Sequence, residues 1–215
     1  LEREGMYFYF EQGDDAEKLI ITDSLSYHDE LVEQAVRYIP ATGEDDVMGN
    51  EALDSFACRR NMLPAEVAVS DYDYVNPSLA LEGTAAVDGV GHIVLHGENF
   101  RTNADGTRIA QVRAEAFLCR RKLYVGHGRV FNLRAGYTFE LEEHPLTSMN
   151  ESYLVTELRH QGNQSANSKQ VKRLLGIDSD DEYKIDLVAI AEDVQFRPQR
   201  LTPVPRIDGV LSALV

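Results

Sequence analysis

The chain has 215 residues, of which 43% are hydrophobic, and a formal net charge of −15 from 36 acidic and 21 basic residues. This hydrophobic fraction supports a folded core and argues against disorder of the whole chain, and no apolar run reaches the roughly 20 residues that span a bilayer. An acidic surface repels phosphate backbones, so we expect no nucleic-acid partner. The negative charge would either keep the protein soluble or line an acidic lumen through which a second acidic molecule moves without binding.

The N-terminal segment predicts a hairpin followed by a long surface excursion. Apolar and aromatic residues at 6–10 and 19–22 flank a turn that begins at Gly13. Because four successive aromatic residues leave no polar face, we expect the first strand to be covered on both sides. Residues 23–54 are polar and acidic, which predicts a surface segment with a short helical turn near residues 31–36. The chain starts at Leu1 with no initiator methionine, and we expect it to be cut from a longer protein.

Three strands and one helix are predicted for the middle of the chain. The strands cover residues 55–62, 66–74 and 79–87, with a turn at Gly89–Gly91. The helix is expected from Asp105 to Lys122, where apolar residues at spacings of 3, 4 and 3 form a single stripe. Its expected cap is Asp105 or Thr107, and its expected basic end is Arg120, Arg121 and Lys122.

The last third of the chain predicts three more strands and an extended tail. Alternating patterns indicate strands at 137–142, 152–161 and 183–191, separated by an exposed loop from residue 162. At least three of five inward-facing side chains should be well buried: Tyr137, Phe139, Leu141, Tyr153 and Val155. Three prolines keep residues 196–205 extended, and with the second hub barrel that the family resemblance below implies, we expect residues 199–206 to run along that barrel.

No local motif indicates catalysis, a cofactor or a metal. The chain lacks a nucleophile elbow, a phosphate loop and a dinucleotide fingerprint. His92 and His96 are spaced i, i+4, but the residues between them favour a strand or loop, where the two imidazoles would not converge. The run 178–182 is better explained as a solvated acidic turn than as a calcium loop, and Cys58 and Cys119 as small buried hydrophobes. We therefore assign no catalytic, cofactor or metal residue, although a site scattered in sequence stays open.

Five segments, in order along the chain, resemble one protein family. These segments are Glu4–Glu11, the Asp71-Tyr-Asp-Tyr74 run with Pro77, the helix with Arg108 and Arg113, the stretch Leu133–Thr156, and Phe196–Gly209 with Arg200. Together they resemble VgrG spike proteins of type VI secretion, in their phage tail hub-like N-terminal region. Two features depart from the family pattern: Ala135, where a proline is usual, and a longer segment at 164–182.

The resemblance implies a mainly β (α+β) fold: a phage tail hub-like β-barrel with one inserted helix and a partial connecting α/β subdomain. The implied domains are 1–75, the remainder of the connecting subdomain; 76–198, the second hub barrel with helix 105–122; and 199–215, an extended exit linker and the start of an OB-like domain. The implied function is a non-enzymatic hub of a homotrimeric spike that adapts three-fold to six-fold symmetry. The implied partners are the Hcp tube ring, baseplate components and, through a region beyond this chain, a PAAR tip protein and effector cargo. The implied location is the cytoplasm before firing, and the target cell or medium after secretion.

Three alternatives remain open. A hub of a contractile phage tail would share the fold, part of a hydrolytic effector would add chemistry, and a carbohydrate-binding module would need exposed aromatics on one platform. The chain has no tryptophan, which disfavours the last.

Overall fold

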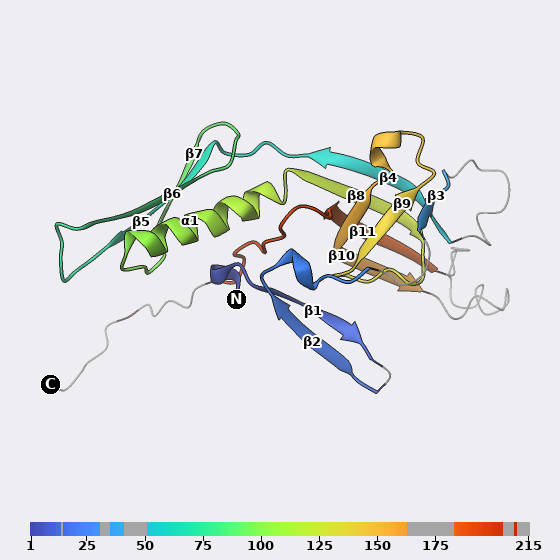
Figure 1. Cartoon of the computed structure of the whole chain (residues 1–215), viewed down its shortest axis with the longest axis horizontal. Helices are drawn as coiled ribbons and strands as arrows, with labels where there is room; N and C mark the ends of the chain where they lie inside the picture. Colours follow the sequence, from blue (N-terminus) through green and yellow to red (C-terminus); the bar gives the residue numbers. More distant parts are fainter. Residues whose placement is uncertain (14, 31–34, 41–50, 163–182, 204–208, 210–215) are drawn as a thin grey trace.

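The computed structural model describes residues 1–13, 15–30, 35–40, 51–162, 183–203 and 209. It has three parts: a closed barrel, a small helix-covered sheet and a projecting hairpin (Figure 1). The mainly β fold with one helix is as predicted. Turn signals at 43–50, the loop from residue 163 and the acidic run 178–182 lie outside the described residues.

The barrel contains six strands in the order β10-β11-β8-β4-β3-β9. Their bounds are Val36–Tyr38 for β3, Ala52–Arg60 for β4, Lys122–Arg129 for β8, Thr138–Glu142 for β9, Ser152–Gly162 for β10 and Tyr183–Ala191 for β11. Most neighbours are antiparallel, but β3 runs parallel to both β4 and β9 and so joins the two ends of the sheet. The strands predicted from alternation, β9 to β11, are confirmed. Residues 31–34 are not described, and Val36, predicted to lie in a helical turn, begins β3.

Aromatic side chains fill the barrel interior. Tyr153 is fully buried, and its ring lies 4.5 Å from that of Tyr124, 5.1 Å from that of Phe56 and 5.7 Å from that of Phe139, measured between centroids. Its hydroxyl donates to the Met149 carbonyl at 2.8 Å, so the polar end of this ring is satisfied. Four of the five side chains expected in the core are buried, all except Tyr137, so the predicted strand register is confirmed.

The small unit is inserted between two neighbouring barrel strands. The chain leaves the end of β4, forms β5 (Glu66–Tyr72), β6 (Ala80–Ala86), β7 (His92–His96) and α1 (Asn103–Leu118), and returns through β8, which pairs with β4. The sheet order is β6-β5-β7, and α1 packs on β6 and β5. The expected boundary at residues 75 and 76 is therefore wrong: β3 and β4 precede it yet belong to the barrel, and α1 follows it yet covers the small sheet. Because the barrel strands come from distant parts of the sequence, the amino-acid composition does not change where the chain passes from one unit to the other.

The helix is shorter than predicted at its C-terminal end. Thr102 is its N-cap, and its hydroxyl accepts from the Asp105 amide at 3.2 Å. The helix ends at Leu118 rather than Lys122, because the chain must turn there to pair β8 with β4. Arg121 then binds the Val87 and Asp88 carbonyls instead of a helix terminus, at 3.1 and 2.9 Å.

Candidate assembly interface

The hairpin of β1 (Tyr7–Gln12) and β2 (Glu17–Thr22) packs on the rest of the molecule through its inner face. Tyr7 and Tyr9 are buried on this face. The Tyr7 ring meets Phe196 edge-on at 4.9 Å, and the Tyr9 hydroxyl donates to the Tyr27 carbonyl. Gly136, with a φ of +89°, allows the Tyr9 ring to lie against the backbone before β9. The inner face thus joins the hairpin to both the barrel and the C-terminal segment.

His28 bridges the hairpin to the barrel. Its Nδ1 lies 2.7 Å from the Gly136 carbonyl and its Nε2 lies 2.7 Å from the Tyr7 hydroxyl. The carbonyl can only accept, so Nδ1 carries the proton and Nε2 accepts from Tyr7. Burial lowers the pKa of His28, partly offset by the bond to Gly136. Burial also raises the pKa of Tyr7 to about 12. Both groups are therefore neutral in the docked hairpin at neutral pH.

This bridge predicts acid sensitivity of the hairpin. The folded-state pKa of His28 is lower than its ordinary value, so the unfolded chain binds the proton more readily. Stability from neutral His28 is present above its ordinary pKa near 6.5 and is lost as pH falls through the lowered folded value. Urea unfolding at a series of pH values measures the free energy of unfolding. As pH falls below 6.5, we expect this free energy to decrease less in His28→Gln than in the wild type. The exposed His92→Gln is the control, and an unchanged pH slope in His28→Gln would contradict the assignment.

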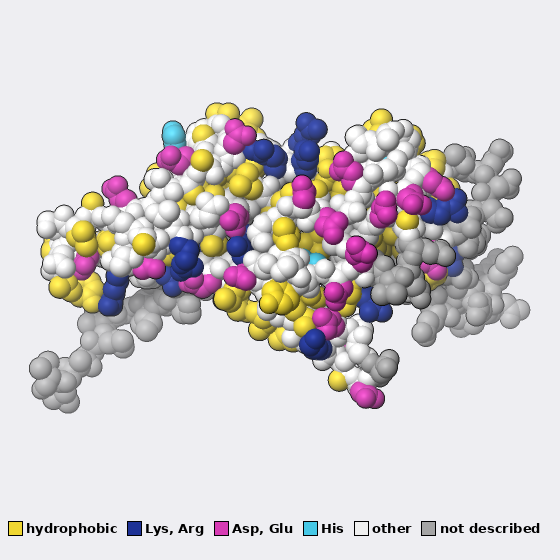
Figure 2. All heavy atoms as spheres, in the orientation of Figure 1, with side chains coloured by type: hydrophobic (Ala, Val, Ile, Leu, Met, Phe, Trp, Pro, Cys, Tyr) yellow, Lys and Arg dark blue, Asp and Glu magenta, His cyan; other side chains and the backbone are white. Residues whose placement is uncertain are grey.

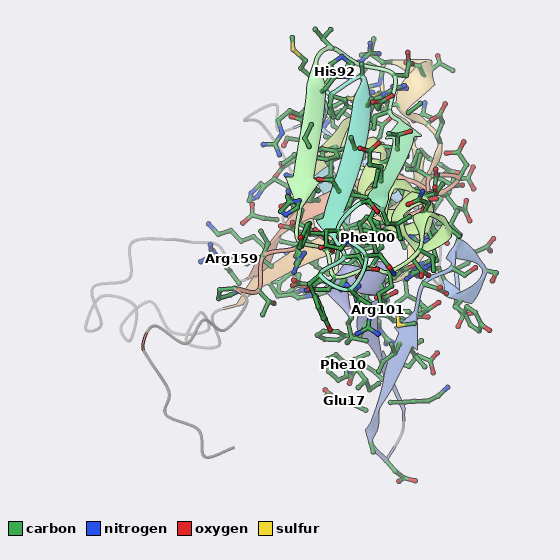
Figure 3. All side chains as sticks on the ribbon, turned by 90° about the vertical axis from the view of Figure 1, so that its left-hand side faces the viewer. Phe10, Glu17, His92, Phe100, Arg101 and Arg159 are labelled. Atoms are coloured by element: carbon green, nitrogen blue, oxygen red, sulfur yellow. The ribbon has the colours of Figure 1, made fainter. Side chains whose placement is uncertain are left out.

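The outer face of the hairpin is apolar and exposed. Cross-strand pairing places Phe8 opposite Ile21 and Phe10 opposite Leu19. Their exposed fractions are 57% for Phe8, 53% for Ile21, 45% for Phe10 and 50% for Leu19. Figure 2 shows hydrophobic side chains gathered over this part of the molecule, and Figure 3 shows Phe10 just above Glu17 along the hairpin. The expectation that the first strand is covered on both sides is thus wrong for the described chain, in which the outer side chains stay about half exposed.

A buried carboxylate joins the two ends of the chain to the small unit. Glu98 follows β7, and its Oε2 lies 3.1 Å from Arg113 Nη2, with both side chains almost fully buried. Its Oε1 lies 2.8 Å from Arg200 Nη1, and its backbone carbonyl accepts from Arg3 at 2.7 Å. Glu98 is thus held by arginines from the N-terminal turn, from α1 and from the segment after the barrel.

The exit segment, residues 196–203, is bound at several further points. Arg197 lies 2.7 Å from Glu115 and donates to the Asp23 carbonyl at 2.7 Å. Glu2 accepts from the amides of Leu201 and Thr202, both at 3.1 Å. Residues 196–203 form no helix or strand, and from residue 199 their polar bonds go to Glu2, to Glu98 and, from the Leu201 amide, to the Gln199 carbonyl rather than to the barrel. The proposed path along the barrel is therefore wrong for residues 199–203, because the carboxylates that bind them lie elsewhere.

Several motif residues of the resemblance meet at this junction. Arg108 lies 2.7 Å from Glu4, and Arg113 and Arg200 share Glu98. Gly5, with a φ of +73°, leaves room for Val112 and Arg197. These positions hold the parts of the chain together. Glu98, the shared partner of Arg113 and Arg200, lies in no motif and was not predicted from the sequence.

The Asp71–Asn76 motif forms a capped turn. Asp71 accepts from the Tyr72 and Phe100 amides at 2.8 and 3.1 Å. Asp73 accepts from the Val75 and Asn76 amides at 2.8 and 3.2 Å, and these bonds lower the pKa of Asp73. Both carboxylates are thus committed to backbone groups beside a cavity of about 420 Å³.

The residues considered for chemistry are not brought together. His92 and His96 are the two ends of β7, on one face but about 13 Å apart at the strand rise. His96 bonds Ser70 at 3.0 Å and His92 faces Glu66 at 3.9 Å. Cys119 is buried and Cys58 partly so. The acidic run 178–182 lies outside the described residues, among which no group of three or more His, Cys, Asp or Glu side chains could hold a metal. That the protein has no catalytic or metal site stays a prediction.

None of the described helices is long and apolar enough to cross a membrane. A sequence model of the phage tail baseplate hub (GPD) family matches residues 1–166. Type VI secretion system spike protein VgrG1a of Pseudomonas aeruginosa is 26% identical over 230 residues, covering 100% of this chain and 33% of the relative. The chain thus spans about a third of the length of this curated relative.

Two solved structures share the fold. One is a component of the E. coli type VI secretion system, described as similar to T4 bacteriophage tail proteins gp27 and gp5. It has a TM-score of 0.54 and 15% identity over 97% of this chain and 40% of that one. The other is the 43 kDa tail protein of prophage MuSo2 from Shewanella oneidensis, with a TM-score of 0.52 and 8% identity over 89% of this chain and 52% of that one.

Proposed function

The chain belongs to the phage tail baseplate hub (GPD) family, and we propose from this premise that it is a structural, non-enzymatic part of the hub of a contractile-injection spike. The observation that carries the proposal is the exposed apolar face of the β1–β2 hairpin. Monomeric proteins seldom leave four large apolar side chains together in solvent, and such a face marks a protein interface.

We propose a homotrimer as the working form, matching a three-fold spike to a six-fold tube. An assembly role needs fixed shape and contact surfaces, and the filled barrel with its ion-paired junction supports that requirement. The Hcp tube ring and baseplate components are the proposed neighbours of the hub. A PAAR tip and effector cargo are proposed partners of the whole protein, because this chain spans only a third of its relatives. The proposed location is the cytoplasm before firing and outside the cell afterwards.

A second candidate is the hub of a contractile phage tail. The structural match to the prophage MuSo2 tail protein favours it, since the two share the fold over most of this chain. The two candidates differ in the machine and not in the role of this chain.

The oligomeric mass of the intact protein tests the proposed function. We expect light scattering to give a trimer at micromolar concentration, with an interface of about 2,000 Å² or more, as obligate assemblies have. A monomer at every concentration would contradict the proposed function.

A further inference from the structure

The outer face of the hairpin combines an apolar patch with a charged end. Phe8, Phe10, Leu19 and Ile21 form the patch, and Glu17 follows on the same face toward the turn, where it pairs with Gln12. The four apolar residues expose on the order of 400 Å², against about 800 Å² per partner in a stable interface. Two hollows that Phe8 lines extend the surface, one beside Met6 and Pro203 and the other beside Leu133 and Leu158.

A basic patch lies where β4 ends and β8 begins, and we call it the basic waist (Arg59, Arg60 and Lys122). Arg60 is the register partner of Lys122 and shares a face with it, whereas Arg59, paired with Leu123, projects from the other face at the same end of the barrel; all three side chains are exposed. Within the described residues none of the three forms an ion pair. Met62, 86% exposed, follows Arg60 by two residues, and Val125 lies on the barrel exterior, on the same face as Arg59. A concentration of unpaired cations is unusual on a chain of net charge −15.

We propose that the outer face of the hairpin docks on the basic waist of a second copy of this chain. This inference rests on the proposed self-association and adds which two surfaces meet. Each surface supplies what the other lacks: the hairpin offers aromatic rings and the Glu17 carboxylate, and the waist offers three exposed cations at one end of the barrel, with Val125 on the face of Arg59. In Figure 2 the basic group lies on the upper side, over the end of β4, and the apolar group on the lower side.

The placement of the two surfaces fixes the type of contact. Different surfaces that meet between identical copies form a head-to-tail contact, which closes into a ring when the rotation per copy allows it. A nucleic acid could bind the basic waist, but its phosphates would gain nothing from the apolar hairpin face. An anionic membrane would be repelled by the acidic surface. A second copy carries the complement to both surfaces.

Cross-linking in the intact protein tests this pairing. With benzoylphenylalanine at position 10, we expect light to link that site to residues 55–62 or 122–125 of another copy. Mixing isotope-labelled and unlabelled copies before irradiation identifies the linked peptides as intermolecular. The same probe at the exposed Tyr74, which follows β5 at the end of the small sheet away from β4, should give no such product. A trimer whose position 10 links elsewhere, or not at all, overturns this inference and leaves the proposed function standing.

Charge reversal provides the second arm of the test. We expect Arg59→Glu with Arg60→Glu to lower the cross-link yield about tenfold, and Glu17→Arg to lower it less, because like charges that face each other across the contact repel and slow association. Combining Glu17→Arg with the two arginine reversals should restore most of the yield, as coupled charges do in a double-mutant cycle. The exposed Arg101→Glu is the matched control and should change nothing. Losses without restoration in the combined variant would overturn the proposed charge pairing.

Discussion

Replacing Glu98 by alanine should destabilise the folded chain by about 3–5 kcal/mol, the usual cost of removing one partner of a buried ion pair. Arg113 would keep its buried charge without a partner carboxylate, and its Nε already has no partner among the described atoms. Arg200 is partly exposed, so water would compensate its loss more readily. Urea unfolding followed by circular dichroism measures the change, and the exposed Glu82→Gln should stay within about 0.5 kcal/mol of wild type.

A second variant separates charge from packing at the same place. Glu98→Met combined with Arg113→Met removes both charges and should recover most of the lost stability, because an apolar pair of similar volume is often as stable as a buried ion pair. In Glu98→Ala alone, trypsin should cut after Arg200 sooner than in wild type, since that side chain loses its partner. Wild-type stability in Glu98→Ala would show that the carboxylate does not hold the junction.

Replacing Gly83 by alanine should lower the stability by about 3 kcal/mol, at the upper end for overpacking. Gly83 lies on the side of β6 that faces α1, and a Cβ there would overlap the backbone of Gly106 and Thr107. Backbone cannot move aside as a flexible side chain does, so α1 would have to shift from the sheet. The buried residues beneath it, Ile109 and Ala110 among them, would lose contacts.

Thermal unfolding of the intact chain measures this effect, with Thr84→Ala as control. Thr84 is the next residue of the same strand but faces solvent, so its replacement tests strand propensity without the clash. Equal melting temperatures for Gly83→Ala and Thr84→Ala would mean that the helix and sheet do not approach as closely as described.

Sequence patterns predicted the strands that alternate. In β9, Phe139 and Leu141 are buried around the exposed Glu140, and the pattern fixed the register without knowledge of any partner. The pattern did not predict β3 or β8. β3 has only three residues, too few for a period, and β8 carries glycines at 126 and 128 that weaken a strand signal. Its start was assigned to the helix, because three basic residues there match a helix end as well as a strand.

The candidate surfaces could be predicted only in part. The aromatic run 7–10 predicts a strand. Which of its faces is buried depends on how the hairpin packs on the barrel and the exit segment, and the local sequence pattern does not determine that packing. Glu98 stands between Gly97 and Asn99 with no helical or strand period around it. Its meaning comes from Arg113 and Arg200, which are 15 and 102 residues away along the chain. Only the fold brings the three together.

The binding of the exit segment to Glu2 and Glu98 has a mechanical consequence. Tension applied to the chain beyond residue 203 meets the bonds from Thr202, Leu201 and Arg200 before it reaches the barrel. Those bonds end on Glu2 in the N-terminal turn and on Glu98, two residues after β7, close to where the chain begins (Figure 1). Load therefore passes from residues 200–202 to Glu2 and Glu98, and Leu201 and Glu2 are 199 positions apart in sequence. The barrel lies beside this path, so a pull on the C-terminal side would strain the junction while leaving the barrel's strand pairing under little force.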